Sequence, residues 1–229
     1  MTQAPPIRLL MAELAAGRDW FRARLPDPAA VSAESDATGP LVMTIPGFCA
    51  GDRSMGAMRR ALAAAGFSAH GWAQGGNWGA RPDTFDRIGA RIAALRGEGN
   101  APVHLVGWSL GGLFAREYAK RCPENVASVI TLGTPFSGSR RANHGWRAYR
   151  LIAGHSVDNP PIAMLDTPKP PVPTFALWSA RDGIVAPECA MGRDDERDHA
   201  LELDCRHLGF AYDRVSARAV IQCLLLATG

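Results

Sequence analysis

Residues 103–112 have the sequence Val-His-Leu-Val-Gly-Trp-Ser-Leu-Gly-Gly. The stretch opens on an apolar run typical of a strand and leads into a helical pattern that starts at Leu110. Between them, Gly107, Ser109 and Gly111 have the Gly-x-Ser-x-Gly spacing of a sharp turn from strand to helix. Glycine at both flanking positions lets strand and helix approach closely. The pattern therefore predicts that Ser109 projects its hydroxyl above the edge of a sheet, where it can act as a nucleophile.

Strand-like and helix-like segments alternate on both sides of this turn. Strands are predicted at residues 41–45, 67–72, 103–107, 126–132, 172–178 and 200–203. Helices are predicted at 55–65, 84–96, 110–121 and 213–227, and residues 7–24 also have a helical spacing. This alternation predicts an α/β fold, with a mostly parallel central sheet and helices on both faces.

The chain of 229 residues is expected to form one α/β domain at 41–229, preceded by an N-terminal helix and loop at 1–40. The Pro- and Arg-rich stretch at about 137–171 interrupts the alternation. An insertion of this length in a compact domain is usually functional, and we expect a small lid over the carboxyl edge of the sheet. A solvated excursion is the alternative.

Composition excludes several classes of protein. The formal net charge of +3 is too small to suggest a nucleic-acid partner. The five cysteines include no Cys-x-x-Cys pair, which excludes zinc-finger spacing and a dense disulfide framework; Cys189 and Cys205 are either two thiols or one bridge. No apolar run approaches the roughly 20 residues that cross a bilayer. The charged N-terminal stretch lacks the pattern of a secretory signal, so we expect a cytoplasmic protein.

A serine nucleophile needs a general base, and the base needs an orienting carboxylate. Of the six histidines, His207 follows the last predicted strand and so reaches the edge where Ser109 lies; His199, in a charged run, is the alternative. Asp182 follows the strand at 172–178, at the same edge. The other candidate carboxylates are Asp158, Asp166 and Asp204. The chain order Ser109, Asp182, His207 is one of the orders in which catalytic triads occur.

Two backbone N–H groups are candidates for holding the oxyanion that forms when a carbonyl is attacked. The N–H of Leu110 begins the helix after Ser109, at its positive end. The second is expected from the turn after an early strand, where Pro46-Gly47-Phe48 follows the strand at 41–45. We therefore predict Phe48 as the second donor, with Gly47 leaving room for the substrate carbonyl. An ordinary Pro-Gly turn is the alternative.

From Leu41 onward the sequence resembles the α/β-hydrolase superfamily, and most of all its bacterial lipase/esterase-like branch. The motifs that carry the resemblance are Pro46-Gly47-Phe48, Gly107-Trp108-Ser109-Leu110-Gly111-Gly112, Leu132-Gly133-Thr134-Pro135, residues 179–185 and His207-Leu208-Gly209. The resemblance implies hydrolysis of an ester through an acyl-enzyme, with no metal or organic cofactor. Many members have His-Gly at the oxyanion turn, whereas this chain has Pro46 in the place of the histidine.

The substrate pocket is expected to involve Gly47, Phe48, Trp108, Phe136, Trp146 and Leu151. The expected substrate is a lipid or small acyl ester. Thioesterase or acyltransferase activity with the same triad is the alternative, and a non-catalytic binding protein of the same fold is a third hypothesis. An acyl carrier or a membrane surface could contact the N-terminal helix or the arginine-rich lid, which contains Arg140, Arg141, Arg147 and Arg150.

Overall fold

The computed structural model describes residues 3–13, 17, 38–138, 142–154, 161–162 and 169–228. Their centre is a six-stranded sheet in the order β2-β1-β3-β4-β5-β6, in which every neighbouring pair is parallel. The strands are β1 (Leu41–Ile45), β2 (Ser68–Gly71), β3 (Val103–Trp108), β4 (Val126–Leu132), β5 (Thr174–Trp178) and β6 (His199–Glu202). The predicted α/β fold with a mostly parallel sheet is confirmed.

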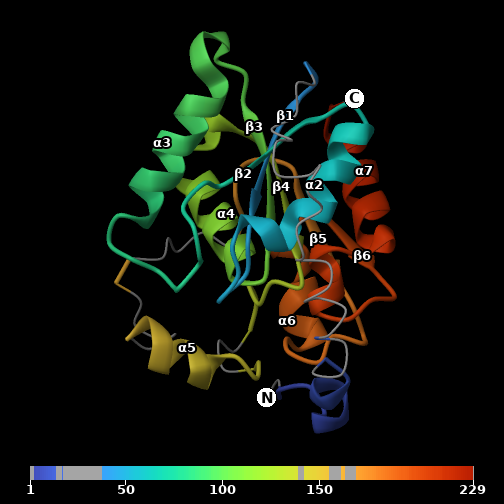
Figure 1. Ribbon diagram of the computed structural model, residues 1–229. Helices are drawn as coiled ribbons and strands as arrows, with labels where there is room; N and C mark the ends of the chain where they lie inside the picture. The colour runs from blue at the N-terminus through green and yellow to red at the C-terminus, as the bar shows by residue number, and fades with distance from the viewer. Residues whose placement is uncertain are drawn as a thin grey trace.

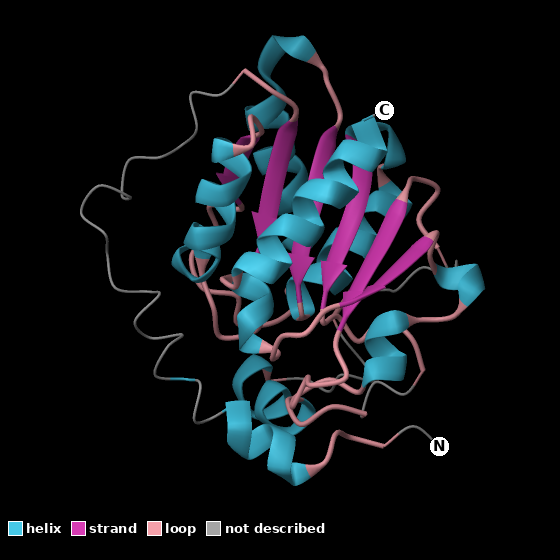
Figure 2. Ribbon diagram, turned by 90° about the vertical axis from the view of Figure 1, so that its right-hand side faces the viewer, coloured by secondary structure: helices cyan, strands magenta, loops and turns pink. Residues whose placement is uncertain are grey.

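Helices cover both faces of the sheet (Figures 1 and 2). From Gly56 onward the described residues form α2 (Gly56–Ala64), α3 (Thr84–Arg96), α4 (Leu110–Arg121), α5 (Trp146–Ala153), α6 (Pro187–Met191) and α7 (Arg214–Thr228), of which α5 lies beyond the end of the sheet. Helices α2 and α7 pack on one face, while α3 and α4 pack on the other. Residues 7–13 form a further helix in the N-terminal segment, and the rest of the helical spacing predicted at 7–24 lies largely outside the described residues.

Two separate apolar cores lie on the two faces of the sheet. Successive side chains of a strand point to opposite faces, so Val42 joins the core under α2 and α7 while Met43 joins the core under α3 and α4. Both side chains are completely buried. Burial on both faces explains why the central strands are continuous apolar runs rather than alternating patterns.

The parallel arrangement brings the carboxyl ends of all six strands to one edge of the sheet. Figure 2 shows the strand arrowheads pointing toward the same end of the molecule. The N-terminal helix and α5 both lie at that end (Figure 1). The loops that follow β1, β3, β5 and β6 therefore meet between the sheet and these two helices. The sequence predicts the candidate site at this edge.

Several boundaries differ from the prediction. The helix expected at 55–65 is preceded by a single 3-10 turn at Asp52–Met55. The expected lid contains α5, but parts of it lie outside the described residues. All five cysteines are free, so Cys189 and Cys205 are two buried thiols and not a bridge. Within the described segments, no helix is long and apolar enough to cross a membrane.

Close contact at the turn after β3 gives a test of the fold. A Cβ on Gly107 would meet Gly112 Cα and would lie 2.5 Å from the carbonyl oxygen of Gly111, so it would collide with backbone that cannot rotate away. We expect Gly107→Ala to lower the free energy of unfolding by on the order of 3 kcal/mol. Gly99→Ala is the matched control, because no heavy atom lies within 4 Å of its Cβ position. Urea unfolding of both variants measures the difference; equal stability would contradict the predicted packing.

Candidate active site

Ser109 occupies the turn between β3 and α4 in a strained backbone conformation. Its φ of 52° and ψ of −120° are rare for a residue with a side chain. The turn is held by hydrogen bonds from Ser109 N to Leu132 O at 2.8 Å and from Gly112 N to Ser109 O at 3.0 Å. Helix α4 begins at Leu110, so its positive end lies beside the serine. This is the strand-turn-helix context that the sequence pattern predicts for a nucleophile.

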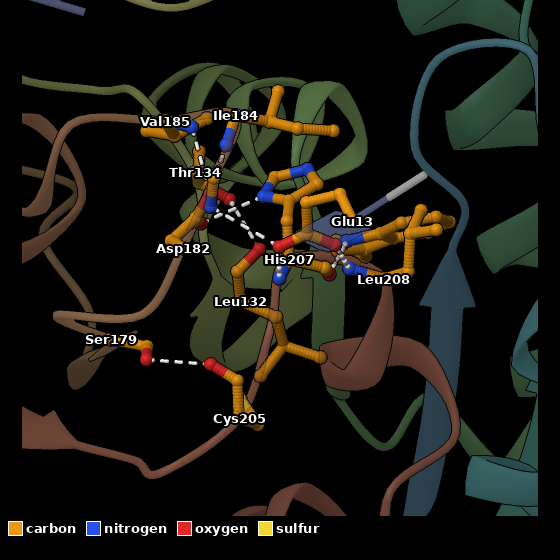
Figure 3. A network of polar contacts seen from close by, with 12 residues as sticks. Glu13, Leu132, Thr134, Ser179, Asp182, Ile184, Val185, Cys205, His207 and Leu208 are labelled. Carbon is orange, nitrogen blue, oxygen red and sulfur yellow. Dashed lines mark hydrogen bonds and ion pairs between the residues drawn. The ribbon is translucent and has the colours of Figure 1, made fainter. Parts of the chain in front are cut away.

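Asp182 and His207 form a buried hydrogen-bonded pair. His207 Nδ1 lies 2.7 Å from Asp182 Oδ2, and the two side chains are 3% and 1% exposed. The other carboxylate oxygen, Oδ1, accepts hydrogen bonds from the backbone N–H groups of Ile184 and Val185, both at 2.8 Å. Figure 3 shows the carboxylate between these amides and the imidazole. The carboxylate accepts a hydrogen bond from Nδ1–H, which leaves Nε2 as the basic nitrogen of the neutral ring.

Opposing influences act on the pKa of His207. Burial is the largest and lowers the pKa, whereas the charge of Asp182, its hydrogen bond and the charge of Glu13 raise it. The raising influences prevail, so the pKa lies above the ordinary histidine value of about 6.5. An imidazole with such a pKa can accept a proton near neutral pH, and the Asp182 carboxylate stabilises the resulting imidazolium.

Trp108 connects the serine turn to the histidine loop. Its indole Nε1 donates a hydrogen bond to the carbonyl oxygen of His207 at 3.1 Å, and the two rings lie 5.8 Å apart between centroids. Ser109 and His207 line the same pocket. The structure thus brings all three residues of the predicted triad to the carboxyl edge of the sheet, from positions that follow β3, β5 and β6.

The turn after β1 packs directly against the serine. A Cβ on Gly47 would lie 3.0 Å from the Trp108 ring and 3.3 Å from Ser109 Cβ, so a larger residue would push these side chains away by a few tenths of an ångström. Asn77, which is 1% exposed, donates from Nδ2 to Pro46 O at 2.8 Å and holds the turn in place. Gly47 thus lies against Ser109, and Phe48, the next residue, lines the same pocket as the serine.

A cavity of about 600 Å³ opens beside Ser109. Of the predicted pocket residues, the structure places Gly47, Phe48, Trp108, Phe136 and Trp146 in its wall. Apolar side chains that the sequence analysis did not select also line it, namely Phe85, Leu113, Phe114, Tyr149, Ile162, Ile184 and Val185. The Phe48 and Tyr149 rings lie 5.1 Å apart.

The prediction that Leu151 lines the pocket is wrong, because its side chain is 85% exposed and lies outside the wall. Helix α5 turns Tyr149 and Ala153 toward Gly79, where both would contact an added Cβ. Those two residues are four apart and share one face of the helix, so Leu151, halfway between them, faces solvent. Periodicity predicts that the helix is amphipathic but not which face turns inward.

Other histidines of the chain and the other candidate carboxylates have different surroundings. His104 is buried with Nδ1 2.8 Å from Ser128 Oγ, and burial lowers its pKa to about 4. His199 is exposed on β6 and stacks on Phe175, and Asp204 pairs with Arg181 at the surface. Three lie outside the described residues: His155, Asp158 and Asp166. Within the described part of the chain, no three His, Cys, Asp or Glu side chains gather as a metal-binding group.

The arginines of the expected lid do not reach the pocket as far as the structure describes them. Arg150 is exposed and is absent from the pocket wall. Arg140 and Arg141 and the side chain of Arg147 lie outside the described residues. The charged groups that do line the cavity come from other elements and include Arg116, Glu117, Lys120, Arg193 and Glu196.

The sequence analysis missed two residues that shape the site. Asn77 lies in a Gly- and Trp-rich loop with no recognisable motif. Glu13 lies in the N-terminal helix, is 2% exposed, and accepts hydrogen bonds from the backbone of Gly183, His207 and Leu208. A single acidic residue in a helix is usually solvated, so nothing in the sequence distinguishes this one.

Comparison with known proteins agrees with the fold. Residues 45–159 match a family model described as the alpha/beta hydrolase fold. No curated protein matched the sequence. A membrane phospholipase A described as a bacterial virulence factor is 17% identical, with a TM-score of 0.63 over 96% of this chain and 97% of that chain. The thioesterase domain of the curacin biosynthetic pathway is 14% identical, with a TM-score of 0.61 over 84% and 93%. The monoacylglycerol lipase of Paleococcus ferrophilus is 16% identical, with a TM-score of 0.60 over 82% and 96%.

His207 and His104, both buried, should titrate on opposite sides of the ordinary histidine pKa. We expect the His207 ring to lose its proton above pH 6.5 and the His104 ring at about pH 4, for the reasons given above. Asp182→Asn removes the charge beside His207, so its pKa should fall while that of His104 stays unchanged. NMR titration of isotope-labelled histidine measures both values. A His207 pKa at or below 6.5 in the unmodified protein would contradict the predicted electrostatics.

Proposed function

The chain belongs to the alpha/beta hydrolase family, and from this premise we propose that it is a serine hydrolase that cleaves carboxylic esters through an acyl-enzyme. Ser109 is the proposed nucleophile and His207 the general base. Asp182 orients the imidazole and stabilises its protonated form. The observation that carries the proposal is the 2.7 Å bond between His207 and Asp182 beside a pocket that Ser109 also lines.

In the proposed acylation step, Ser109 Oγ attacks the ester carbonyl carbon while its proton moves to His207 Nε2. The backbone N–H groups of Phe48 and Leu110 hold the negative charge that develops on the carbonyl oxygen. The carbon–oxygen bond to the leaving alcohol then breaks, and His207 gives its proton to that oxygen. Water, deprotonated by His207, attacks the acyl-serine in turn; the free acid leaves and the serine recovers its proton.

The pocket favours an uncharged acyl group. Its wall near Ser109 is made of aromatic and aliphatic side chains, and a volume of about 600 Å³ is typical of a small-molecule site. The charged groups of the wall are engaged with one another: Lys120 lies 2.9 Å from Glu117, and Arg193 lies 3.2 Å from Glu196. These pairs reduce the net charge that a substrate meets, which favours a lipid or small acyl ester.

A thioesterase or acyltransferase is the second candidate, since the same triad can act on a thioester and a thioesterase domain shares the fold. We also propose an acyl carrier or a membrane surface as a partner, contacted through the N-terminal helix or the arginine-rich lid, in which Arg150 is exposed. An acyl carrier would favour the thioesterase alternative. Parallel assays with p-nitrophenyl esters of several chain lengths and with acyl-coenzyme A distinguish the candidates. Faster turnover of the thioester would favour the second.

Replacing the nucleophile gives the direct test of the proposal. We expect Ser109→Ala to reduce kcat/KM for a p-nitrophenyl ester by about 10⁴-fold or more, because no other group can form the acyl-enzyme. A fluorophosphonate should add to Ser109 in the unmodified protein, and mass spectrometry of the peptide identifies the adduct. A thermal melt of the variant checks that it remains folded. Unchanged hydrolysis, or a phosphonate on a different residue, would refute the proposal.

Replacing Asn77 tests the oxyanion turn. Asn77→Ala leaves the buried Pro46 carbonyl without its 2.8 Å donor, so the turn loses its side-chain anchor but keeps the backbone hydrogen bonds between Asn77 and residues 49 and 50. We expect kcat to fall on the order of 10-fold with a smaller change in KM, since the oxyanion is held only in the transition state. Asn77→Asp places a carboxylate against the same carbonyl and should lower kcat further. Steady-state kinetics with both variants measures the effect, and an unchanged kcat in each would exclude this role for the turn.

A further inference from the structure

One carboxylate of the N-terminal helix lies against the backbone of the two loops that carry Asp182 and His207. Glu13 Oε1 accepts hydrogen bonds from His207 N at 2.7 Å and from Gly183 N at 3.1 Å, and Oε2 accepts one from Leu208 N at 3.2 Å. Figure 3 shows Glu13 beside the backbone of His207 and Leu208. With 2% of its surface exposed, Glu13 is one of the few buried acidic residues described in the protein.

The three donors come from two different loops. Gly183 directly follows Asp182 in the loop after β5, whereas His207 and Leu208 belong to the loop after β6. Glu13 is 170 residues from the first loop and 194 from the second along the chain. A single side chain therefore fixes the backbone of both loops that carry the imidazole–carboxylate pair.

The surrounding packing is adapted to this contact. A Cβ on Gly183 would collide with the carbonyl group of Leu9 and would lie 2.8 Å from Glu13 Cγ, so the glycine lets the helix approach the loop closely. His144 Nε2 lies 2.8 Å from the carbonyl oxygen of Pro5, just ahead of the helix. The helix is thus held at its start by one contact and near its end by another.

We propose that Glu13 is a positioning residue of the active site, which holds the Asp182 and His207 loops together and adds a second negative charge beside the imidazole. The inference rests on the proposed ester hydrolysis, for which the distance between the loops and the charge state of His207 both matter. Glu13 touches neither substrate nor reacting atoms and acts through His207.

The electrostatic part of the proposal involves few ionisable groups. Asp182 and Glu13 are the charged groups that raise the pKa of His207, against the lowering effect of burial. The neighbouring rings of Trp108 and Phe210 carry no charge. Asp213 follows His207 along the chain, and burial has the largest effect on its pKa, which it raises. The charge of Arg206 lowers this pKa and the charge of Glu13 raises it. Removing the charge of Glu13 should therefore lower the pKa of His207, while Asp182 remains to orient the ring.

Two substitutions separate the effect of the charge of Glu13 from that of the length of its side chain. Glu13→Gln keeps the size and one acceptor oxygen but loses the charge, so the acid limb of the kcat/KM profile should move to lower pH by about half a unit. Glu13→Asp keeps the charge but is one carbon shorter, so the acid limb should stay near its original pH while kcat falls about 10-fold. Glu98→Gln, in the exposed turn at the opposite edge of the sheet, is the matched control and should change neither quantity.

The outcomes distinguish this inference from the proposed function. If the unmodified protein hydrolyses esters and Glu13→Gln retains both its kcat and its acid limb, the positioning role is wrong. If Glu13→Gln does not fold, Glu13→Asp decides, because an unchanged kcat in folded protein also overturns the role. The pKa of His207 can also be measured without enzymatic activity. NMR titration should show a lower His207 pKa in Glu13→Gln than in Glu98→Gln. If the unmodified protein neither hydrolyses esters nor reacts with a fluorophosphonate at Ser109, the proposed ester hydrolase activity is refuted instead.

Discussion

The hydrogen bond between His207 Nδ1 and Asp182 Oδ2 joins two buried groups, and burying ionisable groups costs free energy unless their polar atoms find partners. The carboxylate is satisfied by three donors, because its second oxygen accepts the N–H groups of Ile184 and Val185. The backbone of the histidine is satisfied in turn, with its N–H bonded to Glu13 and its carbonyl to Trp108. Each loop at this edge therefore has a conformation that serves the pair.

The sheet makes such an arrangement accessible to a chain whose key residues are far apart. Parallel strands all end at one edge, so the residues after β1, β3, β5 and β6 converge there whatever their separation in sequence. The order of the strands adds a second condition, since β3 lies next to β1 and β6 lies at the rim beside β5. The turn with Gly47 can thus press against Ser109, while the His207 loop is free to fold over the end of β5.

How far the sequence predicts this molecule depends on where the information lies. Continuous apolar runs and the Gly-x-Ser-x-Gly turn are local features, and the helices at Thr84–Arg96 and Leu110–Arg121 begin and end where their patterns predict. Asp182 and His207 are also predictable, because each follows a strand. Glu13 is not, since its partners are 170 to 194 residues away and a helical glutamate is usually solvated. Leu151 fails for a related reason, because its inward or outward orientation depends on which face of α5 meets Gly79.

Arg116, one of the charged residues that line the cavity, is already engaged with other groups of the protein. Arg116 is 4% exposed, and burial lowers its pKa to about 10 despite the opposing charges of Glu196 and Glu117. Its guanidinium lies 4.0 Å from the centre of the Phe136 ring and donates to the carbonyl oxygen of Glu196 at 2.7 Å. A cation already held by a ring and a carbonyl gains little from a further anion, because it would have to give up those contacts. An apolar molecule bound in this pocket would therefore gain most of its binding free energy by leaving water beside apolar side chains such as Phe48 and Trp108.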